Sequence, residues 1–175
     1  VLGFDHEFFQ PILLTLAGLS MVLGALGAMA QRDLRTLLSW DIIGQVGYMV
    51  MGLALFSVAS VTAAIFFILQ YIPVKAALFM VAGSVEKLRG TGNLDELGGL
   101  SRAYPWLGVL FLISALSLAG VPPFPGFWGK LALLQSGFAV SNIGGYTISG
   151  IALGASFFTL FVMVKVWQRV FWGGE

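Results

Sequence analysis

Long apolar stretches separated by short polar turns run through most of this chain. Four of them, residues 11–30, 36–57, 61–85 and 146–170, each hold about 20 or more mostly apolar residues, which is the length that an α-helix needs to cross a bilayer. The pattern lacks the ten-residue alternation of a membrane β-barrel. We therefore predict a bundle of membrane-spanning helices, with the polar segment 86–102 as its long exposed connection.

The apolar stretch at residues 104–141 is harder to interpret, because VPPFP interrupts it near its middle. Its 38 residues would form a straight helix of about 57 Å, nearly twice the ~30 Å hydrocarbon core, so length alone favours two crossings. Prolines remove backbone donors and clash with the preceding helical turn. We therefore expect the helix to be broken at 121–126, a segment that contains Pro122, Pro123, Pro125 and Gly126.

The distribution of basic residues favours one crossing for this broken stretch. A single crossing places on one side all seven basic residues other than Lys75 and Lys130, namely Arg32, Arg35, Lys87, Arg89, Arg102, Lys165 and Arg169. Two crossings would put Lys165 and Arg169 opposite the other five, which fits the positive-inside rule less well. The prediction is five spans, one of them discontinuous, with the N-terminus outside and the C-terminus cytoplasmic.

Composition supports an all-α integral membrane protein and limits its chemistry. The chain is 58% hydrophobic and 10% charged, with a mean hydropathy of +0.94, against about 25% charged residues in a soluble domain. It has no cysteine and one histidine, which excludes disulfides, thiolate metal sites, cysteine-held iron–sulfur clusters and histidine metal clusters within the chain. No cofactor is expected.

Two lysines, Lys75 and Lys130, lie inside apolar stretches, where a charge costs about 2.5–3.5 kcal/mol near the bilayer centre. A lysine there usually faces a wet cavity or a partner, although either one alone could snorkel or pair structurally. Lys130 lies about one turn beyond the proline-rich break, and transporters use interrupted helices of this kind to present charge to an ion. The alternative for the prolines is a simple kink that serves packing.

Asp41 and Gln45 place two further polar side chains inside the second predicted span. Asp41 could pair with a buried lysine or bind a cation, or it could lie hydrated near the interface, only six residues beyond Arg35. Gln45 could orient water, or hydrogen-bond a neighbouring helix, which is the interpretation that we favour.

Four sequence runs, DLRTLLSWDIIGQVGYMVMG, KAALFMVAGSV, GTGNLDELGGLSRAYPWL and SLAGVPPFPGFWGK, carry a resemblance from about residue 30 to the end of the chain. They resemble the proton-translocating, antiporter-like membrane subunits of respiratory complex I, of related hydrogenases and of Mrp-type cation/proton antiporters. The GFWGK and terminal FWGGE forms are most similar to the D subunits of the Mrp type. Subunits of this family contain two inverted five-helix repeats, and the chain resembles only the second, so we expect a fragment forming a single membrane domain.

The resemblance implies roles for individual residues. Lys75 and Lys130 match lysines that relay protons, and Gln45 matches a position in the S-x-x-x-Q-x-G-Y-type helix. Asp33 and Arg35 match an acid and a base at the cytoplasmic turn. They could form part of the channel mouth, or a solvated pair with a helix-capping role.

Two residues depart from the family pattern. Tyr71 stands where the family usually has a histidine, and tyrosine, which titrates near pH 10, relays protons less readily than histidine, which titrates near pH 6.5. Conduction through hydroxyl groups and water would still be possible there. Asp41 replaces what is commonly a serine.

The function that the resemblance implies is proton conduction through intramembrane lysines, coupled to transport of Na+ or another monovalent cation by a multisubunit complex. We expect a secondary-transporter subunit in the cell membrane, and not an enzyme. Its expected partners are other subunits, protons, a monovalent cation and the lipid bilayer, with no nucleic acid. Two alternatives stay open: a proton-pumping subunit of an NADH–quinone oxidoreductase or related hydrogenase, and a purely structural membrane subunit.

Overall fold

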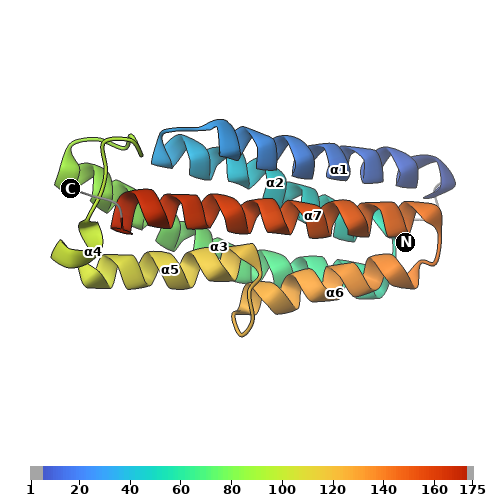
Figure 1. Cartoon of the computed structure of the whole chain (residues 1–175). Helices are drawn as coiled ribbons and strands as arrows, with labels where there is room; N and C mark the ends of the chain where they lie inside the picture. The colour runs from blue at the N-terminus through green and yellow to red at the C-terminus, as the bar shows by residue number, and fades with distance from the viewer. Residues whose placement is uncertain (1–5, 173–175) are drawn as a thin grey trace.

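The computed structural model describes residues 6–172, and the regular structure within this range is helical (Figure 1). Its elements are α1 (His6–Ala30), α2 (Leu34–Ala54), α3 (Val58–Arg89), α4 (Leu100–Ala103), α5 (Pro105–Ala119), α6 (Pro125–Ala139) and α7 (Ile143–Val166), followed by a π-helical extension, Trp167–Trp172. Helices α1, α2, α3 and α7 are each long and apolar enough to cross a membrane. The predicted all-α membrane fold is confirmed.

Helices α5 and α6 follow one another along the bundle and together run its length (Figure 1). Each has 15 residues, or about 22 Å at 1.5 Å per residue, which is too short to cross the bilayer core alone. Together they run antiparallel to α7, which is the arrangement expected of one interrupted crossing, and the crossing itself stays a prediction.

Local capping fixes helix ends that differ from the predicted ones by a few residues. Helix α2 ends at Ala54 instead of residue 57 because Ser57 caps α3: its hydroxyl accepts a bond from the Ser60 amide at 3.0 Å. Helix α3 continues to Arg89, past the predicted residue 85, and ends at Gly90, whose φ of 75° suits glycine. Helix α7 begins at residue 143, earlier than the predicted 146, because Asn142 caps it.

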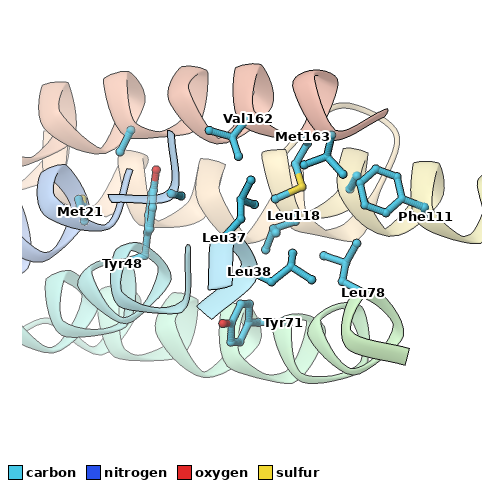
Figure 2. Close-up of a cluster of buried hydrophobic side chains, with 14 of the residues drawn as sticks. Met21, Leu37, Leu38, Tyr48, Tyr71, Leu78, Phe111, Leu118, Val162 and Met163 are labelled. Carbon is cyan, nitrogen blue, oxygen red and sulfur yellow. The ribbon is translucent and has the colours of Figure 1, made fainter. Parts of the chain in front are cut away.

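The helices pack around a shared interior. Helix α1 lies along α2 and α7, α2 along α3, and α3 along α5 and α6. Figure 2 shows the interior between α2, α3, α5 and α7, with Leu37, Leu38, Tyr48, Tyr71, Leu78, Phe111, Leu118, Val162 and Met163 among the buried side chains. Large apolar side chains such as Leu69 and Met80 also cover the outer surface, as expected for helices that face lipid.

The elements that carry the seven basic residues outside the membrane interior meet at one end of the bundle, which we call the basic end (Figure 1). There Asp95 forms ion pairs with Arg169 and Arg32. Lys165 Nζ donates a hydrogen bond to the Met29 carbonyl oxygen at 3.0 Å. The loop after α3, the α1–α2 turn and the C-terminal π-helix are thereby tied together.

Candidate functional site

Both lysines singled out from the sequence are buried inside the bundle, not directed toward lipid. Lys75, in the middle of α3, is 6% exposed, and Lys130, in the second turn of α6, is 4% exposed. An ammonium group in such a place needs a partner, because leaving it unpaired in an apolar interior is costly. The partners of the two lysines differ.

Lys75 forms an ion pair with Asp41 of α2. Its Nζ atom donates to Asp41 Oδ2 at 2.7 Å, and both side chains are less than 10% exposed. Gln45 Nε2 donates to the other carboxylate oxygen, Asp41 Oδ1, at 3.1 Å. Of the interpretations left open for Asp41, the structure shows the pairing with a buried lysine. Gln45 bonds within its own helix, one turn from Asp41, instead of to a neighbouring helix.

Lys130 has a different environment. Its Nζ atom lies 4.7 Å from the centre of the Tyr48 ring and 3.4 Å from the carbonyl oxygen of Ala119, the last residue of α5. Among the described side chains, no carboxylate lies within ion-pairing distance of Lys130. A π face and the negative end of a helix dipole therefore take the place of a counter-ion.

Asp41, Gln45 and Tyr48 form a polar stripe on the inner face of α2, and this stripe joins the surroundings of the two lysines. Their spacing of four and three residues places them on one side of a helix. Over seven residues the stripe extends about 10 Å along α2. Tyr48 was not among the residues predicted from the sequence, although its spacing from Asp41 and Gln45 was a visible signal.

Tyr48 also connects the stripe to α7. Its hydroxyl donates to the Ala152 carbonyl oxygen at 2.6 Å and shares a 2.8 Å hydrogen bond with Ser156 Oγ. In Figure 2 the Tyr48 ring stands between α2 and α7, with its hydroxyl directed toward α7. The ring is thus held from two helices.

Tyr71 lies one turn before Lys75, where its ring stacks on Phe67, which in turn stacks on Tyr48, at centroid distances of 6.1 and 5.6 Å. The Tyr71 hydroxyl and Gln45 Oε1 are buried and have no hydrogen-bond partner among the described residues. Buried polar atoms are usually bonded to protein or to ordered water. Two such atoms near the Asp41–Lys75 pair mark a polar region in an otherwise apolar interior.

The helix break lies at residues 120–124, slightly earlier than the predicted 121–126. Gly120 ends α5 with φ of 83°, and Pro122 and Pro123 lie in the break. Pro125 and Gly126, which were predicted to lie within the break, instead form the first turn of α6. The reason is that proline is well suited to the first helical position, where no backbone donor is needed.

The backbone donors of the break all have acceptors. The amides of Gly120, Val121 and Phe124 each bond to a nearby carbonyl oxygen, and the remaining residues of the break are prolines, which have no N–H. The following amide, that of Gly126, donates to Ser117 Oγ at 3.4 Å. Such a segment leaves no unpaired N–H group at membrane depth, which is the main cost of unwinding a helix there.

Asp33 and Arg35 lie at the basic end, apart from the buried stripe. Asp33 caps α2 by accepting bonds from the Thr36 amide at 2.8 Å and from its hydroxyl at 2.7 Å. Arg35 forms an exposed ion pair with Glu86 of α3 at 2.6 Å. The capping role is therefore present, while a place at a channel mouth stays a prediction.

Comparisons with known proteins agree with this architecture. The family model described as NADH:quinone oxidoreductase/Mrp antiporter, transmembrane, matches residues 1–159. The chain is 45% identical over 174 residues to the D subunit of the Na(+)/H(+) antiporter of Alkalihalophilus pseudofirmus, covering 98% of this chain and 35% of that protein. It is 37% identical to the D subunit of the Na(+)/H(+) antiporter of Bacillus subtilis, covering 98% of this chain and 34% of the relative. The chain thus spans about a third of the length of these relatives.

Solved structures give the same result. A chain in the Mrp complex from Dietzia sp. DQ12-45-1b superposes with a TM-score of 0.90 and 35% identity, covering 98% of this chain and 32% of the other. A chain of respiratory complex I from Thermus thermophilus superposes with a TM-score of 0.89 and 25% identity, covering 97% of this chain and 36% of the other. With its apolar helices and these relatives, the protein is a multi-pass membrane protein that belongs to the NADH:quinone oxidoreductase/Mrp antiporter family.

Proposed function

We propose that this chain is the second five-helix repeat of the proton-conducting subunit of a multisubunit Na+/proton antiporter. The name of the relatives at 45% and 37% identity supports the antiporter branch, and the lower identity of 25% to a complex I chain makes a redox-driven pump the second candidate. Its partners are then other membrane subunits of the complex, and its substrates are protons and a monovalent cation. The basic end faces the cytoplasm, in accordance with the positive-inside rule.

The observation that carries the proposal is the position of the two buried lysines beside one polar stripe. Lys75 is bound to Asp41 at one end of the stripe, and Lys130 lies against Tyr48 at the other. Asp41 and Tyr48 are about 10 Å apart along the axis of α2, a distance that about three hydrogen-bond steps would cover. Gln45 lies between them, and its free oxygen could hold a water molecule that carries an intermediate step.

Each lysine has a distinct task in this proposal. The Asp41 carboxylate holds the Lys75 ammonium group in place at one end of the stripe. Lys130, held without a carboxylate, passes its proton onward at the helix break. Tyr71 stands where the family usually has a histidine, and its buried hydroxyl, which has no hydrogen-bond partner among the described residues, contributes to the water chain.

The test is antiport in everted vesicles that contain the complete complex, followed with a pH-sensitive dye on addition of Na+. We expect Lys130→Ala to lose most of the Na+-induced proton movement at matched expression. Lys87→Ala is the control, because Lys87 is an exposed lysine at the end of α3.

Two outcomes would contradict the proposal. Full antiport in a normally assembled Lys130→Ala complex would remove that lysine from the proton path. A wild-type complex that ignores Na+ and moves protons only when NADH is added would place the chain in the redox-driven branch of the family.

A further inference from the structure

Lys130 is buried without a counter-ion, so its ammonium group needs another source of stabilisation. Its hydrogen bond to the Ala119 carbonyl oxygen is 3.4 Å long, outside the usual range of about 2.7–3.2 Å for such bonds. The other close group is the face of the Tyr48 ring, with Nζ 4.7 Å from the centroid. This distance is well within the range of about 6 Å over which a cation is attracted to an aromatic face.

The Tyr48 ring is held in place from three sides. Its backbone belongs to α2, its hydroxyl is bonded to Ala152 and Ser156 of α7, and its face stacks on Phe67 of α3 at 5.6 Å. The side chain is 2% exposed. A ring fixed in this way presents its π face at a constant position, so it defines where the Lys130 ammonium can lie.

We propose that Tyr48 is the positioning residue for Lys130, holding the ammonium group beside the helix break through the face of its ring. This inference rests on the proposed function, since it concerns the same proton path. It goes beyond it by assigning the role of a counter-ion to a neutral aromatic side chain. Two properties of Tyr48 are separate in this account: the ring face binds the ammonium group, and the hydroxyl keeps the ring in place.

Because the ring face and the hydroxyl of Tyr48 have different roles, variants that remove one or the other should lose transport to different degrees. Tyr48→Phe keeps the face and loses the bonds to α7, so we expect transport to fall only a few-fold. Tyr48→Leu removes the face, and because a desolvated cation–π contact is worth about a factor of ten or more in an equilibrium, we expect a loss of at least about tenfold. Tyr48→Trp supplies another electron-rich face and is expected to restore part of the loss.

The decisive experiment replaces Tyr48 in the full-length subunit with phenylalanine carrying zero, one, two or three ring fluorines, and measures Na+-driven proton movement in vesicles of the complete complex. Fluorine draws electron density from the ring face and weakens its attraction for a cation while leaving the shape of the ring nearly unchanged. We expect transport to fall stepwise with each fluorine. The same series at Tyr146, a half-exposed tyrosine at the start of α7, is the control and is expected to show no trend.

Equal transport across the series at position 48 would overturn the inference, because a merely structural ring tolerates fluorine. Lys130→Ala, measured in the same vesicles, separates this failure from failure of the proposed function. If Lys130→Ala abolishes transport and the fluorine series is flat, only the role of Tyr48 is wrong. If Lys130→Ala transports normally, the proton path through Lys130 is wrong, and the role of Tyr48 is overturned with it.

Discussion

Removing the Asp41 carboxylate leaves the Lys75 ammonium group buried without its counter-ion, and the cost of this change can be worked out from the structure. The two charged atoms are 2.7 Å apart, and the side chains are 6% and 8% exposed. Breaking a buried pair by removing one partner costs about 3–5 kcal/mol. A lone lysine near the bilayer centre costs about 2.5–3.5 kcal/mol on insertion scales, which agrees with that range.

A double-mutant cycle isolates this interaction. We expect Asp41→Asn to lower the free energy of unfolding of the full-length subunit by about 3 kcal/mol. Lys75→Met, which leaves a buried carboxylate, is expected to be similarly harmful. The double variant Asp41→Asn/Lys75→Met carries no buried charge at this pair, so most of the lost stability is expected to return, with a coupling energy of at least about 2 kcal/mol.

The assay is unfolding of the purified subunit in mixed micelles by added SDS, followed by tryptophan fluorescence. The control cycle uses the exposed pair Arg35 and Glu86, whose side chains are 55% and 30% exposed, and is expected to yield at most about 1 kcal/mol. A coupling energy for Asp41 and Lys75 no larger than that of the control pair would refute the view that these residues form a desolvated ion pair.

Three further changes have defined expected outcomes. Gly126→Ala places a Cβ atom against the carbonyl oxygen of a residue in α5 and is expected to destabilise the subunit by about 1–3 kcal/mol. The control is Gly150→Ala, a helical position with open space around it, which is expected to be neutral or stabilising. The temperatures at which the two variants aggregate on heating compare their stabilities. Asp33→Ala removes the cap of α2 and is expected to lower the free energy of unfolding in SDS by about 1 kcal/mol. An unchanged free energy of unfolding would contradict this role of the cap. Lys165→Met removes the bond to the Met29 carbonyl oxygen, so hydrogen exchange at the α1–α2 turn is expected to rise while the middle of α7 stays protected.

Features of the fold that depend on residue type alone, such as the placement of basic residues and prolines, could be predicted from the sequence. The basic residues predicted that α5 and α6 run in the same direction along the bundle, and the broken helix followed from the prolines. The exact limits of the break did not, because proline both interrupts a helix and begins one, and Pro125 does the second. Helix ends moved by a few residues where a Ser, Asn or Gly cap outweighed the apolar pattern.

The contacts within the site were harder to predict from the sequence. Asp41 and Lys75 are 34 residues apart in sequence, and only the way α2 packs along α3 brings them together. The partner of Asp41 could not be chosen from the sequence for this reason. Tyr48 could have been found from its helical spacing relative to Asp41 and Gln45, but its contacts with Lys130 and α7 depend on three helices meeting at one ring.

The prolines of the α5–α6 junction make this interruption permanent. A break built from ordinary residues could heal into one continuous helix during a working cycle, since the missing hydrogen bonds could form. Pro122 and Pro123 have no N–H to contribute and restrict their own backbone angles, so α5 and α6 cannot be joined by an unbroken ladder of helical hydrogen bonds. In a continuous helix the amides of residues 122 and 123 would bond to the carbonyl oxygens of Leu118 and Ala119, and prolines at these positions cannot do so. The carbonyl oxygen of Ala119 is thereby left for the Lys130 ammonium group, so the same prolines that interrupt the helix also supply a negative pole beside the buried charge.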